Sequence, residues 1–402
     1  MKITAIETLR LTGRPNLLLV QVHTDEGLTG LGETSRGAAA VEAQIHELLA
    51  PQLIGQNPLD IAGQHRAMMA SYLGFQSSGT EVRAASAIDI ALWDILGQAS
   101  GQPLWQALGG RCRSGIRVYN TCAGYRYNNT SVARRAVRAD EPAPAREGPY
   151  DDQIAFVHHP EELAHSLLEE GIGAMKIWPF DPFAADRDGS MLSHADLELA
   201  LEPWRRIRAA VGDRIEIMAE FHSLWNLEQA LRIARALEAY RPFWSEDPIR
   251  MGDADTLKAY RDGTSIPVCG SETLGGTYPF RDMLAKQAVD IVMLDLGWCG
   301  GLTEAKKIAA LAEAWQRPVA PHDCNGPVVW VASIHFMAHI PNALIMEVVR
   351  AYYSTWYKDL LTELPVVRNG RVEPLAGPGL GTRLLPDLPR RDGVQVRRSG
   401  AG

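Results

Sequence analysis

Short apolar runs and amphipathic, helix-like runs alternate along the second half of this 402-residue chain. Six of the apolar runs end in an acidic residue or a histidine, at Glu220, Glu246, Glu272, Asp295, His322 and Glu347. The steps between these end positions are 26, 26, 23, 27 and 25 residues. A strand of about five residues, a helix of about ten to fifteen and two short loops need about that length. The pattern therefore predicts a (β/α) barrel, in which functional groups sit at the C-terminal ends of the strands.

The first part of the chain has a different pattern. Residues 3–35 alternate as two strands followed by a hairpin with Asp/Gly turn chemistry, and residues 38–97 carry helical periodicity. Strands followed by helices, without alternation, predict a small α+β domain over residues 1–115. The barrel is expected over residues 116–350, beginning with a strand at 116–122. Residues 351–402 are turn-rich and too short for a domain, so we expect them to pack back on the N-terminal one.

Residues 126–152 interrupt the barrel pattern. The segment is rich in Arg, Ala and Pro and has almost no apolar periodicity. Because it follows a barrel strand, it leaves from the catalytic face. Two interpretations stay open, a surface loop or a lid whose arginines help to hold an anionic substrate.

Composition narrows the class of protein. The chain is 46% hydrophobic and 22% charged, with a formal net charge of −8 and both signs mixed along the chain. This balance argues against nucleic acid or an anionic membrane as the main partner. We find neither a secretory signal nor an apolar run long enough to span a membrane. Five cysteines without a CxxC pair indicate reduced thiols, so we expect a cytoplasmic protein.

The glutamates at three consecutive strand ends are Glu220, Glu246 and Glu272. Adjacent strands lie less than about 5 Å apart, so three such anions would repel each other strongly in a partly dry site. A hard divalent cation resolves this repulsion, and three monodentate carboxylates leave about half of an octahedral Mg²⁺ shell open for substrate oxygens. The alternative is a set of solvated or Arg-paired acids.

The next two strand ends, Asp295 and His322, suggest a general base. A carboxylate beside an imidazole fixes its tautomer and raises its basicity. His222 lies two residues past Glu220, so in an extended strand it would point to the same side. It could be a metal ligand, a hydrogen-bond donor to substrate or a general acid. Lys176 could pair with a substrate carboxylate or with a glutamate. Glu347 could accept a hydrogen bond from substrate or form a salt bridge to Arg350.

This constellation resembles the enolase superfamily, and within it the mandelate racemase subgroup. Residues 86–110, SAIDIALWDILGQASGQPLWQALGG, look like that family's joint between cap and barrel, and WSEDP and CGSE resemble its second and third metal-ligand motifs. The racemase carries Lys-x-Lys on its second strand, whereas this chain reads Lys176-Ile177-Trp178. His222 instead resembles the general acid of the galactonate and mannonate dehydratases. Glu220 stands where those enzymes usually carry Asp.

The resemblance implies a (β/α)7β-type TIM barrel with an N-terminal α+β capping domain that the C-terminal segment completes. It also implies one Mg²⁺ per subunit, a homo-oligomer and an acid-sugar dehydratase, a lyase of carbohydrate-acid catabolism whose substrate is an aldonate or aldarate. In this hypothesis His322, oriented by Asp295, removes the proton α to the carboxylate, and Lys176 and the metal stabilise the enediolate. His222 assists loss of the 3-hydroxyl, which gives a 2-keto-3-deoxy acid. The expected substrate contacts are Glu347, Trp178, Tyr72 and Asn120, with a cap loop at 71–79 closing over the distal hydroxyls.

Three alternatives stay open from the sequence. A cycloisomerase or epimerase would share the enolate step and give a product of unchanged mass. A family member that binds a sugar acid without turnover would serve as a sensor or structural partner. An unrelated metal-dependent barrel hydrolase would need a histidine-rich Zn²⁺ shell, and only His222 and His322 are placed for one.

Overall fold

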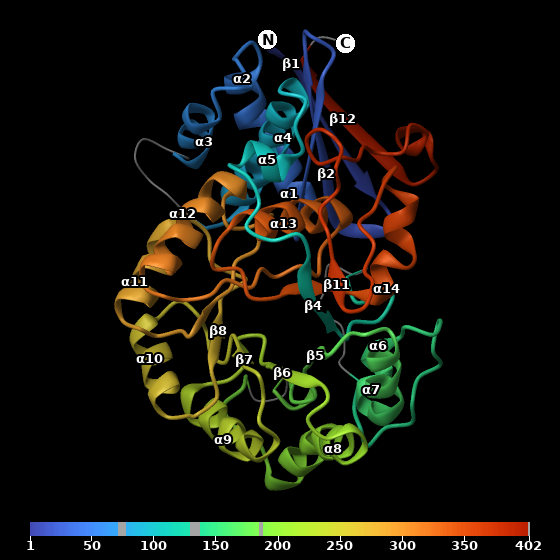
Figure 1. The fold of residues 1–402 in the computed structure, drawn as a ribbon, viewed down its shortest axis with the longest axis vertical. Helices are drawn as coiled ribbons and strands as arrows, with labels where there is room; N and C mark the ends of the chain where they lie inside the picture. The colour runs from blue at the N-terminus through green and yellow to red at the C-terminus, as the bar shows by residue number, and fades with distance from the viewer. Residues whose placement is uncertain (71–77, 129–136, 185–187, 401–402) are drawn as a thin grey trace.

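The computed structural model describes residues 1–70, 78–128, 137–184 and 188–400. An antiparallel sheet with its helices forms a cap at one end of the molecule, and a barrel of parallel strands with surrounding helices forms the other (Figure 1). Both chain termini lie in the cap, at the end far from the barrel.

The cap sheet joins the two ends of the chain. Its strands are β1 (Ile3–Leu11), β2 (Arg14–Thr24), β3 (Thr29–Ser35) and β12 (Val394–Gly400), in the order β12-β1-β2-β3. β12 runs antiparallel to β1, with Gly400 opposite Ala5. The C-terminal strand therefore completes a sheet that the N-terminal hairpins begin.

One long helix covers this sheet. The helices of the cap are α1 (Ala38–Ala43), the π-helix η1 (Gln44–Leu49), α2 (Ala50–Leu53), α3 (Ile61–Met69), α4 (Thr80–Ala99) and α5 (Leu104–Ala107). α4 approaches β3 closely because Gly30 and Gly32 have no side chain. A Cβ on either glycine would overlap a backbone carbonyl oxygen of α4, at Ala91 or at Ala87.

Seven parallel strands form the barrel sheet, in the order β10-β4-β5-β6-β7-β8-β9. They are β4 (Ile116–Thr121), β5 (Ala174–Ile177), β6 (Glu216–Glu220), β7 (Ser245–Glu246), β8 (Val268–Gly270), β9 (Ile291–Val292) and β10 (Met346–Val348). Val319 bridges Val292 of β9 and Ala343, three residues before β10, and so links the two edges of the sheet. A short strand, β11 (Arg371–Val372), pairs antiparallel with β4. The predicted fold class, a (β/α)7β-type barrel with an antiparallel cap, is confirmed.

Helices follow the barrel strands. They are α6 (Asp152–His158), α7 (Pro160–Glu169), α8 (His194–Val211), α9 (Leu227–Leu237), α10 (Ala254–Asp262), α11 (Thr277–Ala285), α12 (Gly301–Ala314), α13 (Pro327–His339) and α14 (Arg350–Tyr353). Short 3₁₀ turns are η2 (Asp181–Phe183), η4 (Glu238–Tyr240), η5 (Trp356–Asp359) and η6 (Leu388–Arg390). Side-chain caps begin α8, α9 and α10. Ser193 accepts from the Asp196 N–H, Asn226 from the Gln229 N–H and Asp253 from the Asp255 N–H.

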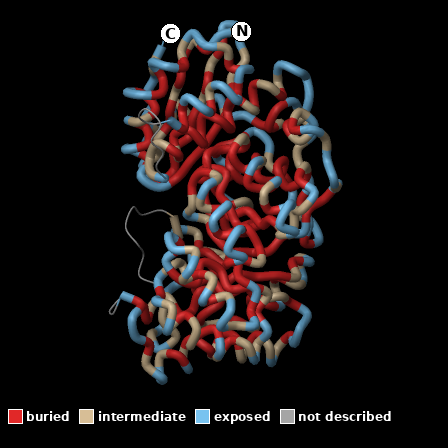
Figure 2. Tube along the Cα trace, turned by 90° about the vertical axis from the view of Figure 1, so that its left-hand side faces the viewer, coloured by how far each residue is buried: buried red, intermediate tan, exposed pale blue. Residues whose placement is uncertain are grey.

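Buried residues run through both the barrel and the cap (Figure 2). Every residue of α13 from Pro327 to Ala338 is buried, because this helix packs against both β3 of the cap and strands of the barrel. The barrel strands contribute a separate apolar cluster that includes Tyr119, Met218 and Trp244. The indole N–H of Trp244 donates to Glu246 Oε2 at 3.0 Å, so the polar groups lie directly next to this apolar layer.

Among the described residues, no helix is both long enough and apolar enough to cross a bilayer.

Candidate active site

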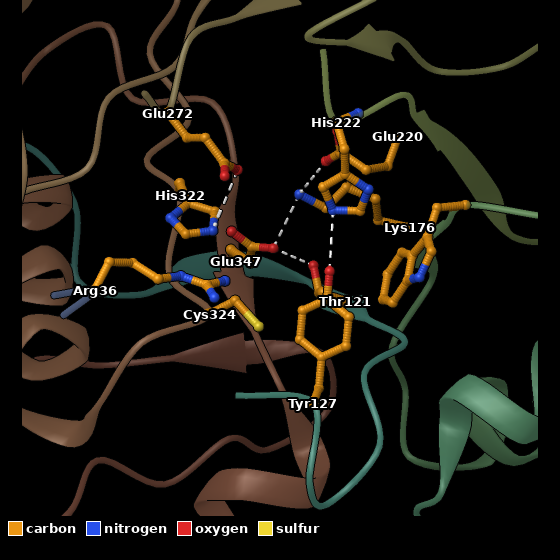
Figure 3. A pocket seen from close by; sticks show the side chains of 11 residues that line it. Arg36, Thr121, Tyr127, Lys176, Glu220, His222, Glu272, His322, Cys324 and Glu347 are labelled. Atoms are coloured by element: carbon orange, nitrogen blue, oxygen red, sulfur yellow. Dashed lines mark hydrogen bonds and ion pairs between the residues drawn. The ribbon is translucent and has the colours of Figure 1, made fainter. Parts of the chain in front are cut away.

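Polar side chains from separate strands meet in one pocket at the C-terminal ends of the barrel strands (Figure 3). Parallel strands that close a barrel bring these ends to the same edge, although they are far apart in sequence. The described residues that line the pocket are Arg36, Thr121, Tyr127, Lys176, Trp178, Glu220, His222, Glu272, His322, Cys324 and Glu347.

Glu220, Glu246 and Glu272 each place a carboxylate oxygen within 4.8 Å of the other two. β6 and β7 set Glu220 directly opposite Glu246. Burial and the charge of Glu220 raise the pKa of the Glu246 carboxyl well above its usual value. Glu220 Oε2 is buried without a hydrogen bond, although Lys176 Nζ lies 3.1 Å away. An oxygen-only donor set of this kind, with Glu220 and Glu246 buried and Glu272 half-buried, fits a hard divalent cation.

Lys176, near the end of β5, lies between three carboxylates. Its Nζ is 3.1 Å from Glu220, 2.5 Å from Glu246 and 3.1 Å from Glu347. Burial alone would lower the pKa of Lys176, but the charges of Glu246 and Glu347 outweigh it and raise the pKa. The ammonium group therefore stays charged in a buried position at the centre of the site.

His322 is oriented by Asp295, as the sequence predicts. Its Nδ1 lies 2.6 Å from Asp295 Oδ2, an oxygen that also accepts from Asn325 Nδ2. This contact leaves Nε2 facing the pocket, 3.2 Å from Glu272. Burial would lower the pKa of His322, but the charges of Glu272, Glu347 and Asp295 raise it to about 9. The arrangement suits a strongly basic imidazole whose tautomer is fixed from behind.

His222 lines the same pocket, but its backbone conformation differs from the one expected. The expectation of an extended backbone at this residue is wrong, because β6 ends at Glu220 and His222 has a φ of 48° in the turn that follows. The N–H groups of Phe221 and His222 donate to Glu220 Oε1, at 3.0 and 2.8 Å, and hold this turn. Histidine is among the residues that tolerate such a left-handed conformation.

The ring of His222 has two polar partners. Nδ1 lies 2.7 Å from Asp181 Oδ2, and Nε2 lies 3.1 Å from the Tyr127 hydroxyl. The ring also packs edge-on against Trp178, with centroids 5.6 Å apart. Burial would lower the pKa of His222, but the charges of Asp181 and Glu220 raise it to about 10. These charges favour the protonated form of the His222 imidazole, the form that can donate a proton.

Glu347 lies on β10 at the centre of the pocket. It accepts from the Asp323 N–H at 2.6 Å and from the Thr121 hydroxyl, and it pairs with Lys176. The alternative salt bridge to Arg350 is wrong. Arg350 is buried beside Asp152 and Glu170, each at 2.7 Å, because its side chain points toward α6 and α7.

Two predicted substrate contacts have different outcomes. Asn120 does not line the pocket: its Nδ2 donates to Asp152 Oδ2 at 2.9 Å and its Oδ1 accepts from the Arg350 N–H at 3.0 Å. The side chain faces this buried pair because residues alternate along β4, and it is the next residue, Thr121, that faces the site. Tyr72, with most of the expected cap loop 71–79, lies outside the described residues.

Sequence reasoning missed several residues of the site. Arg36 follows a cap strand, Tyr127 lies inside the insertion, and Asp181 lies in the polar connection after β5. Only Asp181, an acid just beyond a barrel strand, carries a signal that could have found it. The described arginines Arg126 and Arg138 pair with Glu147 and Asp140 outside the pocket.

Comparison with known proteins gives two family matches that together cover most of the chain. Residues 160–388 match the model described as enolase C-terminal domain-like. Residues 4–109 match the N-terminal domain model of mandelate racemase and muconate lactonizing enzyme.

Curated relatives match over nearly the full length. A D-xylonate dehydratase of Haloferax volcanii is 32% identical over 95% of this chain and 87% of its own length. A D-galactonate dehydratase of Ralstonia pickettii is 31% identical over 95% of this chain and 91% of its own. Dehydratases of this kind are hydro-lyases.

Solved structures agree in fold. An enolase of the mandelate racemase subgroup from Agrobacterium tumefaciens is 50% identical, with a TM-score of 0.88, over 100% of this chain and 99% of that one. An enolase protein from Sargasso Sea environmental sequencing is 46% identical, with a TM-score of 0.88 and the same coverage.

Proposed function

The chain belongs to the enolase superfamily, with the two domains of the mandelate racemase and muconate lactonizing enzymes, and from this premise we propose that it dehydrates an acid sugar. The hydro-lyase class predicted from the sequence agrees with the D-xylonate and D-galactonate dehydratases that it resembles. The substrate proposed is an aldonate or aldarate, and the product is a 2-keto-3-deoxy acid.

One observation carries the proposal. Two imidazoles, His322 and His222, line the same pocket, and each has a carboxylate on its Nδ1, at 2.6 Å from Asp295 and 2.7 Å from Asp181. Each ring therefore directs its Nε2 away from its own carboxylate. Dehydration requires one group that takes a proton and another that gives one, and the site supplies both.

Glu220, Glu246 and Glu272 are the residues that would hold one Mg²⁺. When bound, the ion would stabilise negative charge that develops on the substrate carboxylate. Its positive charge would also offset the charge of Glu272, which raises the pKa of His322.

In the proposed reaction His322 Nε2 accepts the proton from the carbon α to the carboxylate. Asp295 holds the ring in the required tautomer and stabilises its charged form. The electrons of the broken C–H bond pass into the carboxylate as an enediolate, whose charge Lys176 helps to stabilise. When these electrons return from the enediolate, they form the double bond between carbons 2 and 3, and the C–O bond to the 3-hydroxyl breaks.

His222 gives its proton to the departing 3-hydroxyl, which leaves as water. Asp181 and Tyr127 hold the His222 ring, and Trp178 packs against it. The enol then takes a proton at carbon 3 and becomes the 2-keto acid. Glu347 and Trp178 are proposed substrate contacts because both line the pocket beside these groups.

The test is a screen of aldonic and aldaric acids with Mg²⁺, with 2-keto acid detected as its semicarbazone. We expect keto acid from one substrate or a few stereochemically related ones. His322→Asn and His222→Asn should each lower the rate by about 10²- to 10⁴-fold, the usual contribution of general acid–base catalysis.

Two results would count against the proposal. Exchange of the α-proton with solvent but no keto acid from any sugar would indicate an isomerase. Neither exchange nor keto acid would indicate a protein that binds without turnover.

A further inference from the structure

Arg36 is a pocket residue with no assigned role in the proposed reaction. It is exposed, follows β3 of the cap and lines the site with the catalytic groups. Figure 3 shows its guanidinium group reaching into the pocket on the side opposite Lys176. Among the described residues, the Arg36 side chain forms no hydrogen bond or ion pair.

The other cations of the site are already engaged. Lys176 contacts three carboxylates, His322 contacts Asp295 and Glu272, and His222 contacts Asp181. The positive charge of Arg36 is therefore the one in the described pocket that remains available for an anion brought by the ligand.

The backbone that carries Arg36 is held in place by both parts of the molecule. The Arg36 N–H donates to Asn16 O at 2.8 Å, and Arg36 has a φ of 70°. Just before it, the Thr34 hydroxyl donates to Gly297 O at 2.7 Å and the Ser35 hydroxyl donates to Asn325 Oδ1 at 2.5 Å. These two partners follow barrel strands. The start of the Arg36 side chain is therefore fixed relative to the catalytic residues.

A second hollow adjoins the site at Arg36. Its other described lining residues include Arg14, Asn16, Asn128 and Trp356. The Arg14 guanidinium stacks over the Trp356 ring at 4.4 Å and donates to the Tyr125 carbonyl, and no carboxylate of the described residues pairs with it. Asn128 Oδ1 is buried without a hydrogen bond. The hollow thus continues the pocket with a second positive charge and an unsatisfied acceptor.

We propose that the substrate carries a second anionic group at the end remote from the glutamates, and that Arg36 binds it. The inference rests on the proposed function, because it takes the first carboxylate to lie at Lys176 and the three glutamates. Asn128 Oδ1 then accepts from a substrate hydroxyl, and Arg14 adds to the positive potential of this end. The shared chemistry is a terminal anion, supplied by the second carboxylate of an aldarate or by the phosphate of a phosphorylated aldonate.

The experiment compares matched acids that differ only at the remote end: galactarate with galactonate, and glucarate with gluconate and 6-phosphogluconate. Turnover with Mg²⁺ is measured for the wild type, Arg36→Gln and Arg36→Lys. Arg66→Gln, which removes an exposed arginine of α3 outside the pocket, is the matched control. Binding of the same acids to His322→Asn protein, with and without Arg36→Gln, is measured by calorimetry as a readout separate from turnover.

We expect a doubly anionic acid to be favoured over its aldonate. Arg36→Gln should lower kcat/KM for that acid by about 10- to 100-fold, mainly through KM, because a charge-assisted bond is lost, and should weaken its binding by a similar factor. Arg36→Lys should recover part of the loss. Neither Arg36→Gln with aldonates nor Arg66→Gln with any acid should show this effect. A preference for aldarates assigns the anion as carboxylate, and a preference for 6-phosphogluconate assigns it as phosphate.

Equal or better turnover of aldonates, or an equal effect of Arg36→Gln on both kinds of acid, would overturn the inference and leave the proposed dehydratase intact. Absence of keto acid from every sugar would overturn both. Binding of a doubly anionic acid that Arg36→Gln does not weaken would overturn the inference alone.

Discussion

At the scale of single residues, the two histidines of the pocket differ in their surroundings rather than in their type. His322 has Asp295 behind it and Glu272 in front, whereas His222 lies between Asp181 and the Tyr127 hydroxyl. Each carboxylate fixes which ring nitrogen faces the pocket. The proposed division into base and acid therefore depends on residues that do not themselves react.

Asp181→Asn tests this dependence. The loss of the Asp181 charge should lower the pKa of His222 and loosen its ring, so keto-acid formation should fall by about 10- to 100-fold, within the range of general acid catalysis. Exchange of the α-proton by His322 should remain close to that of the wild type. NMR in deuterated water measures both rates in one sample. An equal loss of both would show a general structural defect instead.

The strand-end glutamates, Asp295 and His322 could be predicted because repeated spacing alone brings them to one edge of a barrel. Arg36, Tyr127 and Asp181 could not, because their place in the pocket depends on how loops far apart in sequence pack together. The error about His222 has a related cause. Its local backbone is set by hydrogen bonds to Glu220, which periodicity does not report.

At the scale of elements, β3 is the cap strand that contacts the loops around the site. It packs against α4 through Gly30 and Gly32, and its last residues contact the loops after the barrel strands through Thr34 and Ser35. Glu33, which lies between Gly32 and Thr34, accepts from the N–H groups of Val328 and Val329 at the start of α13. The hairpin predicted within residues 3–35 implied a strand here, but not that this strand would face the barrel on one side and α4 on the other.

Gly32→Ala tests the contact between β3 and α4. Its methyl group would overlap the carbonyl oxygen of Ala87, so we expect a loss of about 1–3 kcal/mol in the free energy of unfolding, as for overpacked cores. Gly63→Ala in α3 meets no atom within 4 Å and should be neutral or stabilising by up to about 1 kcal/mol. Denaturant titration measures both. A wild-type stability for Gly32→Ala would show that α4 does not need this close approach.

At the scale of the whole molecule, buried polar contacts join barrel, cap and C-terminal segment. His335 of α13 accepts from the Trp105 N–H through Nδ1 and donates to Leu380 O through Nε2, each at 3.2 Å. Only the neutral ring makes both bonds. Burial outweighs the Leu380 hydrogen bond and lowers the pKa of His335 from 6.5 to about 4.

The stability of the protein should therefore depend on pH through His335. Between about pH 4 and 6.5 the unfolded chain binds this proton and the folded chain does not, so the free energy of unfolding falls as the pH is lowered. The full effect is up to about 3 kcal/mol. His335→Gln, which does not titrate, should remove this part of the pH dependence, while His194→Gln at an exposed site should keep it. Superimposable pH profiles for the wild type and His335→Gln would contradict the account.

The most direct test of the central claim is the mass of the product formed from an accepted sugar acid in deuterated water with Mg²⁺. Dehydration by His322 and His222 predicts a keto acid that has lost one water and gained one deuterium at carbon 3. It also predicts that His322→Asn lowers product formation and α-proton exchange together. A product of unchanged mass with deuterium at the α-carbon would contradict the dehydratase and identify the protein as an isomerase.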